Sequence, residues 1–264
     1  MRRHLILRLE APLMAFGGTM IDAIGPTREL PILSMITGLI GNALGWHRGD
    51  RDKHQELQDR LIIGARLDRA GTELFDFQTA LLFEDEKNWT TRGKPEGREK
   101  SPSYSWGRSG RKELNHIRKR FYRADAFVTV ALRLEPAAAS PDLDAIAAAL
   151  ITPARPLFIG RKPCLPARPV HAGETVDAPT VFDALLATTI VAGFPQPRWR
   201  KEELPDPVRI VVPPAEWPPT GNDRTETVSN VRDWVAGVHA GENRLVLLSR
   251  PRTDFPPWPP GALP

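Results

Sequence analysis

The sequence predicts an α+β fold whose strands and helices follow one another in the order β-α-β-β-α-β. Three observations predict this order. Apolar and polar residues alternate over 4–9 and 126–134, which is typical of strands. Apolar residues recur at helical spacing between 34 and 44. An alanine-rich stretch ending at Ile151 follows two residues suited to capping a helix.

The first strand and the first helix lie within the first 44 residues. One face of the strand at 4–9 consists of Leu5, Leu7 and Leu9. A glycine-rich connection follows, and we expect Ser34 to cap a helix that runs to about Leu44. The apolar face of that helix consists of Ile36, Leu39, Ile40, Ala43 and Leu44.

The opposite side of this helix has three glycines, Gly38, Gly41 and Gly45. Each glycine costs about 1 kcal/mol of helix propensity relative to alanine. Another part of the molecule, or a ligand, is therefore expected to approach these positions closely. Of the two, we favour tight packing of the helix on a sheet.

Five further segments follow. Strands are expected at 61–67, 74–83 and 126–134. Ser140 or Asp142 is expected to cap the second helix, and 155–162 (RPLFIGRK) is predicted to be a short last strand. This order is typical of a ferredoxin-like or RRM-like domain, here interrupted after its third strand by an inserted hairpin or loop.

The last third of the chain gives a weaker pattern. Fourteen of the 27 prolines lie within 195–264, and strand-like islands occur at 208–212 and 244–248. Prolines at this density interrupt strands and favour irregular connections. We therefore expect a smaller β-containing subdomain that ends in a loose tail.

The domain organisation follows from these patterns. At 264 residues the chain can hold one large domain or two small ones. We expect an RRM-like domain over 1–170 with an insertion at about 84–124, and a smaller irregular or β region over 171–264. The single cysteine, Cys164, excludes an internal disulfide. Since no stretch is apolar enough for export or membrane insertion, a soluble cytoplasmic protein is expected.

Charge is concentrated in one internal segment. Residues 87–123 contain twelve Lys/Arg and three Glu, a net charge of +9, whereas the whole chain is only +4. Five aromatic residues lie among these cations: Trp89, Tyr104, Trp106, Phe121 and Tyr122. Cations neutralise phosphates and aromatic rings stack on unpaired bases, so this mixture indicates a single-stranded nucleic acid partner. A solvated loop is the alternative, but such loops are poor in aromatic residues.

Sequence signatures of catalysis are missing. The chain has no phosphate-binding P-loop motif, no H-E-x-x-H, no G-x-S-x-G and no Cys/His cluster, so neither a metal nor a cofactor is expected. Metal-independent RNA cleavage keeps some support, because His116, Tyr104 and Tyr122 lie in the basic segment and can move protons. Such residues beside RNA bind it more often than they cut it.

Four motifs give the sequence a family resemblance. In chain order they are LILRLEAPLMAFGG, GPTRELPILSMITGLIGNALGWHRGD, FYRADAFVTVAL and RPLFIGRKPCLPARPV. Together, over the first 170 or so residues, they resemble the type I-E CasD family, a subunit of the CRISPR surveillance complex Cascade. The residues that match the family pattern are Pro26, Thr27, Arg28, Ser34, Gly38, Gly41, Tyr122, Asp125, Gly160, Arg161 and Cys164. The basic segment is longer than the pattern, and the proline-rich third has no counterpart in it.

The resemblance implies a fold, a role and partners. The fold is RRM-like, of the RAMP superfamily, with a β-hairpin thumb at the basic segment. The role is non-catalytic: in antiviral defence the subunit anchors the 5′ handle of the guide RNA (crRNA). The partners are the crRNA, the large subunit, the backbone subunits and, through the assembled complex, target DNA. An endoribonuclease that processes precursor crRNA is the alternative, and a general single-stranded nucleic acid chaperone is a third possibility that does not explain the motifs.

The expected RNA contacts combine the family pattern with the basic segment. A glycine ridge lets backbone amides approach RNA, while cations and rings hold its phosphates and bases. The expected RNA-binding residues are Gly17, Gly18, Thr27, Arg28, Ser34, Gly38, Arg48, Lys94, Arg98, Lys100, Trp106, Arg108, Arg111, Lys112, Arg118, Tyr122, Arg161 and Lys162.

Overall fold

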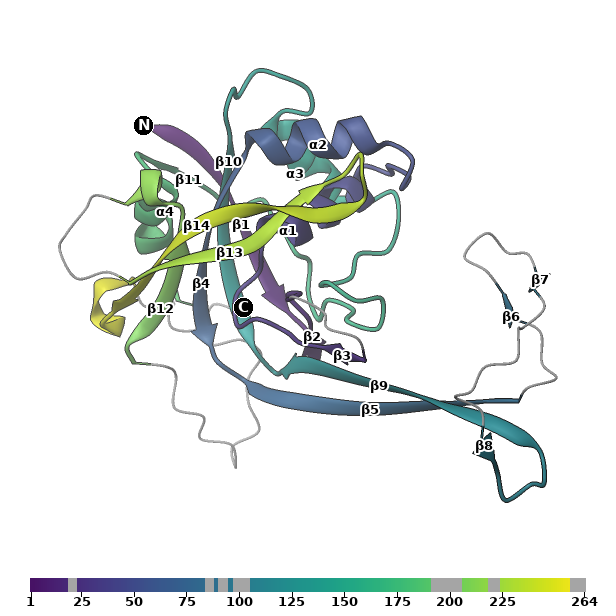
Figure 1. Ribbon diagram of the computed structural model, residues 1–264. Coiled ribbons are helices and arrows are strands. Elements are labelled where there is room, and N and C mark those ends of the chain that lie inside the picture. Colours follow the sequence, from purple (N-terminus) through teal and green to yellow (C-terminus); the bar gives the residue numbers. More distant parts are fainter. Residues whose placement is uncertain are drawn as a thin grey trace.

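The computed structural model describes residues 1–18, 23–83, 88–89, 95–96, 105–190, 206–217 and 224–256 (Figure 1). Its helices are α1 Leu33–Ala43, α2 Arg51–Arg60, α3 Leu143–Ile151 and α4 Val181–Ala187. Its strands are β1 Arg2–Glu10, β2 Leu13–Met14, β3 Ile24–Gly25, β4 Leu61–Arg69, β5 Thr72–Phe83, β6 Asn88–Trp89, β7 Pro95–Glu96, β8 Ser105–Trp106, β9 Lys112–Ala124, β10 Phe127–Leu134, β11 Thr175–Ala178, β12 Val208–Val212, β13 Arg224–Asp233 and β14 Val238–Arg250. The expected α+β class is confirmed. None of the helices in these ranges is long and apolar enough to cross a membrane.

Seven strands form the main sheet, in the order β11-β1-β10-β4-β12-β14-β13, and neighbouring strands are antiparallel. The alternation seen in the sequence sets its two faces. Leu5, Leu7 and Leu9 of β1 pack in one apolar cluster with α1 and α3. Ile6 points the other way, into a second cluster with α4 and β12. Strands from the last third of the chain therefore extend the same sheet as β1 and β4.

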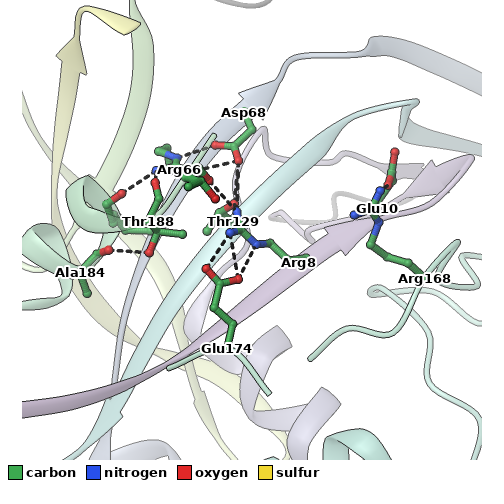
Figure 2. A network of polar contacts seen from close by, with 11 residues as sticks. Arg8, Glu10, Arg66, Asp68, Thr129, Arg168, Glu174, Ala184 and Thr188 are labelled. Atoms are coloured by element: carbon green, nitrogen blue, oxygen red, sulfur yellow. Dashed lines mark hydrogen bonds and ion pairs between the residues drawn. The ribbon is translucent and has the colours of Figure 1, made fainter. Parts of the chain in front are cut away.

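A network of polar side chains is buried on the α4 face of the sheet (Figure 2). Arg66 is fully buried, and its guanidinium donates to both carboxylate oxygens of Asp68. It also donates to the backbone oxygens of Leu185 and Thr188, at the end of α4. Arg8 joins Thr129 and Glu174 to the network. These bonds tie β1, β4 and β10 to the chain around α4.

The β5–β9 hairpin projects from the body of the molecule (Figure 1). It continues β4 and β10, and the strands bend at Gly71 and Asp125, which have φ of 59° and 56°. A Cβ on Gly71 would lie 2.1 Å from the backbone oxygen of Ala124, so this position requires glycine. The carbonyl of Asp125 accepts a hydrogen bond of 2.6 Å from Arg69 Nε. The residues at the bend thus fix where the hairpin leaves the sheet.

Several expectations about elements need correction. The strand at 74–83 exists as β5, but it pairs with β9 and not with the main sheet, so the hairpin lies between β4 and β10 and begins at Thr72. Residues 155–162 form no strand, because turns hold them. The amide of Ile159 donates to Cys164 O, and the amide of Cys164 donates to Arg161 O. The edge position beside β1 belongs to β11, Thr175–Ala178.

The helix caps divide into one correct and one wrong prediction. Asp142 caps α3, accepting a 2.8 Å hydrogen bond from the amide of Ala145. Ser34 does not cap α1, because Ile32 occupies that position without a side-chain bond, and Ser34 is buried in the first turn. Helix α2 was not predicted. Its residues are polar except for Leu57, which lies in the core.

Candidate nucleic-acid interface

A cationic groove of about 790 Å³ lies between α1 and the β13–β14 hairpin. The two walls come from distant parts of the chain, and Figure 1 shows β13 and β14 crossing over α1. Four arginines and two histidines line the groove, and none of the described lining residues is acidic. These six residues are Arg48, Arg51, His54, Arg161, Arg232 and His239. We call this site the α1 groove.

The glycines of α1 make room for the α1 groove and for its wall. A Cβ on Gly41 would lie 2.5 Å from Nε2 of His54, which is closer than a carbon atom can come. A Cβ on Gly38 would lie 3.6 Å from Cη2 of Trp234, an ordinary contact. The close approach expected at these positions is therefore made by α2 and the β13–β14 turn, and not by the face of the sheet.

An aromatic stack forms the far wall of the α1 groove. The rings of His54 and Trp234 are stacked, with centroids 4.6 Å apart and planes inclined by 22°. Trp46 meets His54 edge-on at 5.2 Å. The guanidinium of Arg232 lies over the Trp234 ring, 4.9 Å from its centroid. The loop after α1, helix α2 and the β13–β14 turn thus meet in one cluster of rings, and Arg232 covers the last of them.

Glutamines of α2 hold the β13–β14 hairpin in this position. The side chain of Gln58 is buried, and its Nε2 donates to the carbonyl of Arg232 at 2.8 Å. Its Oε1 accepts from the indole Nε1 of Trp234 at 3.0 Å. Gln55 accepts from the Trp234 backbone amide, and Arg51 donates to Val235 O at 2.9 Å. These bonds replace the neighbouring strand that the end of β13 lacks.

Burial and like charge affect the titration of two groups in the α1 groove. Desolvation, and next to it the positive charge of Arg48, hold the pKa of Arg232 below its ordinary value. Desolvation and the charge of Arg232 lower the pKa of His239 in the same way. Because like charges face each other here, the groove favours an anion.

The β5–β9 hairpin is the second cationic surface, and its two faces differ. Cross-strand register places Phe75 opposite Phe121 and Thr79 opposite Ile117 on one face. On that face Phe75, Phe77, Leu81 and Ile117 are exposed. The other face pairs Asp76 with Arg120 and Gln78 with Arg118. The hairpin therefore has an apolar face and a polar, largely basic face.

The basic residues expected to bind RNA lie partly on this hairpin. Arg118 is exposed on the polar face, and Trp106 is 72 % exposed. Arg111 lies over the ring of Phe83 at 4.0 Å, and Lys112 lies near Trp106. Arg108 is exposed in the turn before β9. Three further expected residues, Lys94, Arg98 and Lys100, lie outside the described residues.

The remaining expected residues gather at or beside the α1 groove. Five of them line it: Gly17, Ser34, Gly38, Arg48 and Arg161. Gly18 and Thr27 shape the loop beside it, where Thr27 Oγ1 accepts from the amide of Phe16 at 2.9 Å. The backbone amide of Arg28 closes this loop by donating to Gly17 O. Lys162 is exposed in the turn after Arg161.

Two of the expected contact residues make contacts that stabilise the fold. Tyr122 is only 4 % exposed, and the Arg161 guanidinium covers its ring at 4.8 Å. Arg161 itself donates to the carbonyls of Phe121 and Gly25, joining β9 to β3. Cys164 is buried in the same turn, and burial raises the pKa of its thiol. This part of the motif holds the fold together.

Sequence reasoning missed one wall of the α1 groove. Arg51, Arg232, Trp234 and His239 line it, but they lie in segments where no element or motif was recognised. The sequence signal that could have found this wall is an arginine and a tryptophan two positions apart, Arg232 and Trp234, in a strand-like stretch. Among the described residues, no group of three or more His, Cys, Asp or Glu is placed to hold a metal ion.

Comparisons with known proteins agree on one family. The model of the family described as CRISPR-associated protein (Cas_Cas5) matches residues 4–246. The CRISPR system Cascade subunit CasD of Escherichia coli (strain K12) is 29 % identical over 202 residues, covering 73 % of this chain and 80 % of that protein. A solved chain of a CRISPR RNA-guided surveillance complex superposes with a TM-score of 0.63 at 22 % identity, covering 98 % of this chain and 94 % of that one. A crystal structure of a Cas protein gives 0.58 at 20 % identity, covering 97 % and 100 %.

Proposed function

The chain belongs to the Cas5 family of CRISPR-associated proteins, and we propose that it is a non-catalytic Cascade subunit that anchors the 5′ handle of the guide RNA. The family model supports this over most of the chain. The Escherichia coli relative is by name a Cascade subunit, and one similar fold belongs to a CRISPR RNA-guided surveillance complex. In this proposal the α1 groove is the surface that binds the RNA.

The cationic α1 groove is the observation that carries this proposal. Its described lining includes four arginines and two histidines and no acidic residue, beside a helix whose Gly38 leaves the floor open. Single-stranded RNA exposes its phosphates and its bases. A groove with arginines, backbone at close range and a wall of aromatic rings suits such a strand by charge and shape.

The β5–β9 hairpin has the role of a thumb in this proposal. Its polar face, with Arg118 and Arg120, follows the RNA backbone. Its apolar face, with Phe75 and Phe77 exposed, contacts the first backbone subunit, while the large subunit docks beside the handle. Target DNA is met through the assembled complex.

An RRM-like domain is the frame for both surfaces. Strands β11, β1, β10 and β4 lie in this order, and α1 and α3 cover one face. That arrangement supports an RRM-like body with the hairpin inserted between β4 and β10. The strands of the C-terminal region then extend the body and, through β13, supply one wall of the α1 groove.

The alternative, an endoribonuclease, gains no support from the placement of its two described candidates, His116 and Tyr122, and Tyr104 lies outside the described residues. Tyr122 is buried under Arg161, and His116 on β9 faces Ala80 across the hairpin. A general acid needs a partner base within reach of the same RNA bond. The register gives His116 no such partner directly opposite.

Binding and cleavage of a repeat-containing RNA test the proposal. The full chain is mixed with labelled repeat RNA and with a shuffled RNA of the same length, with and without divalent metal. We expect tighter binding of the repeat RNA, which contains the 5′ handle, than of the shuffled RNA, and no cut in either. A single defined cut that disappears in His116→Ala would establish the endoribonuclease. Equal affinity for both RNAs would contradict handle recognition.

A further inference from the structure

Arg232 is held in a fixed position at the open end of the aromatic stack. Its Nη2 donates to the carbonyl of Gly237 at 3.2 Å, and its guanidinium lies over Trp234. The indole in turn is bound to Gln58. An arginine fixed in this way loses little further entropy when it binds a ligand.

The same guanidinium has a donor that lacks a partner. Nε of Arg232 is buried and has no hydrogen-bond acceptor among the described residues. Buried donors are nearly always paired, and one without a partner costs free energy. Because this nitrogen is enclosed by the chain, a ligand in the groove can approach the guanidinium only from the side of its outer nitrogens.

A second arginine faces the same space. Arg48 lines the α1 groove and lies close enough to Arg232 for its charge to lower the pKa of that residue. Arg48 is exposed, and no carboxylate of the described chain is paired with it. Two guanidiniums that repel each other and line the same groove are complementary to an anion.

We propose that Arg48 and Arg232 together bind a single phosphate group of the RNA in the α1 groove. The inference rests on the proposed function and names the chemical group that this site recognises. The phosphate is either an internal phosphodiester or a terminal phosphate. A phosphodiester brings one negative charge and a terminal phosphate up to two, so only a terminal phosphate balances the charge of both arginines.

Salt dependence of RNA affinity tests the shared phosphate. The full chain, Arg48→Ala, Arg232→Ala and the double variant are titrated with labelled repeat-derived RNA over a range of salt concentrations. Loss of one phosphate contact flattens the slope of log K against log salt by about 0.7 for single strands. Because the remaining arginine still contacts the shared phosphate in each single variant, we expect a slope near that of the wild type in those two variants and a loss of about 0.7 in the double variant. Arg224→Ala, on the same strand β13 but with a side chain 77 % exposed, is the control and should keep the wild-type slope.

The outcomes separate the inference from the function. An additive loss of about 1.4 in the double variant would mean two separate phosphates and would overturn the shared site. An unchanged slope in the double variant, with wild-type binding intact, would overturn this site and leave the proposed function standing. Failure of the wild-type chain to bind the RNA would overturn both. Arg48→Ala controls for a folding defect, since this side chain is exposed. RNAs with a 5′-phosphate or a 5′-hydroxyl distinguish the sources, because only a terminal phosphate makes the slope loss depend on that group.

Discussion

Single residues of the α1 groove differ in what they tolerate, and the glycines of α1 show this most clearly. Gly41 lies against His54, so a methyl group has no space there, whereas Gly38 faces open groove and touches only Trp234. The same substitution at the two positions should therefore act in opposite directions. Helix propensity is equal for both and cannot explain a difference.

Gly41→Ala should lower the free energy of unfolding by roughly 1–3 kcal/mol, because it overpacks the contact with His54. Gly38→Ala should leave stability unchanged or raise it by up to about 1 kcal/mol, through better helix propensity. Urea unfolding of both variants checks this. Equal destabilisation by the two changes would contradict the geometry of the groove.

The buried network of Figure 2 gives a second prediction for single residues. Asp68 is fully buried and pairs with Arg66, so Asp68→Ala leaves a guanidinium buried without its counter-charge. We expect a loss of about 3–5 kcal/mol in the free energy of unfolding. Asp144→Ala is the matched control, since it removes an exposed ion pair to Arg3 and should leave the unfolding midpoint near that of the wild type. Similar midpoints for both variants would mean that the network does not stabilise the fold.

Among the elements, α2 decides where the β13–β14 hairpin lies. Gln58 satisfies the carbonyl of Arg232 and the indole of Trp234, and both would lose their partner in Gln58→Ala. We expect a loss of roughly 1–3 kcal/mol in stability, together with weaker RNA binding, because the wall of the α1 groove loosens. Glu56→Ala, an exposed change on the same helix, is the control. RNA affinity that stays at the wild-type value while stability falls would show that this wall is not part of the RNA site.

The two faces of the β5–β9 hairpin lead to a prediction about assembly. Phe77 is 52 % exposed on the apolar face, and its neighbour Gln78 points to the polar face. If a protein subunit covers the apolar face, Phe77→Ser should weaken assembly by about 2 kcal/mol, roughly thirtyfold, and leave RNA affinity of the single chain unchanged. Gln78→Ser should not affect assembly. Co-purification of the complex at graded concentrations measures this, and a loss of RNA affinity with normal assembly would reverse the roles of the faces.

For the whole molecule, the sequence predicted best where a pattern reports a local preference. The alternation in β1 and β10 predicted their two faces, because one side must meet α1 and the other α4. The glycines of α1 indicated a close approach, and its partner, His54, lies on a helix with almost no apolar pattern. Charge counting found the hairpin, since its cations are close together in sequence.

The rest depends on pairings between distant segments. The wall of the α1 groove forms because β13, after residue 224, reaches α2 near residue 55. No local pattern predicts that contact. Arg161 and Tyr122 show a different limit of sequence reasoning, because their motif was recognised but did not reveal their structural role. Arg161 joins β3 and β9 by hydrogen bonds and covers the ring of Tyr122. A motif match does not separate residues that hold the fold from residues that touch a ligand.

Crosslinking within the assembled complex tests the central claim, that the α1 groove holds the 5′ end of the guide RNA. The handle is labelled with 4-thiouridine at successive positions, and the assembled complex is irradiated. The peptides of this chain that become crosslinked are then identified. We predict crosslinks in α1, in the β13–β14 hairpin around Trp234, and on the polar face of β9. Crosslinks confined to α4, on the opposite face of the sheet, and to the edge strand β11 would contradict the account.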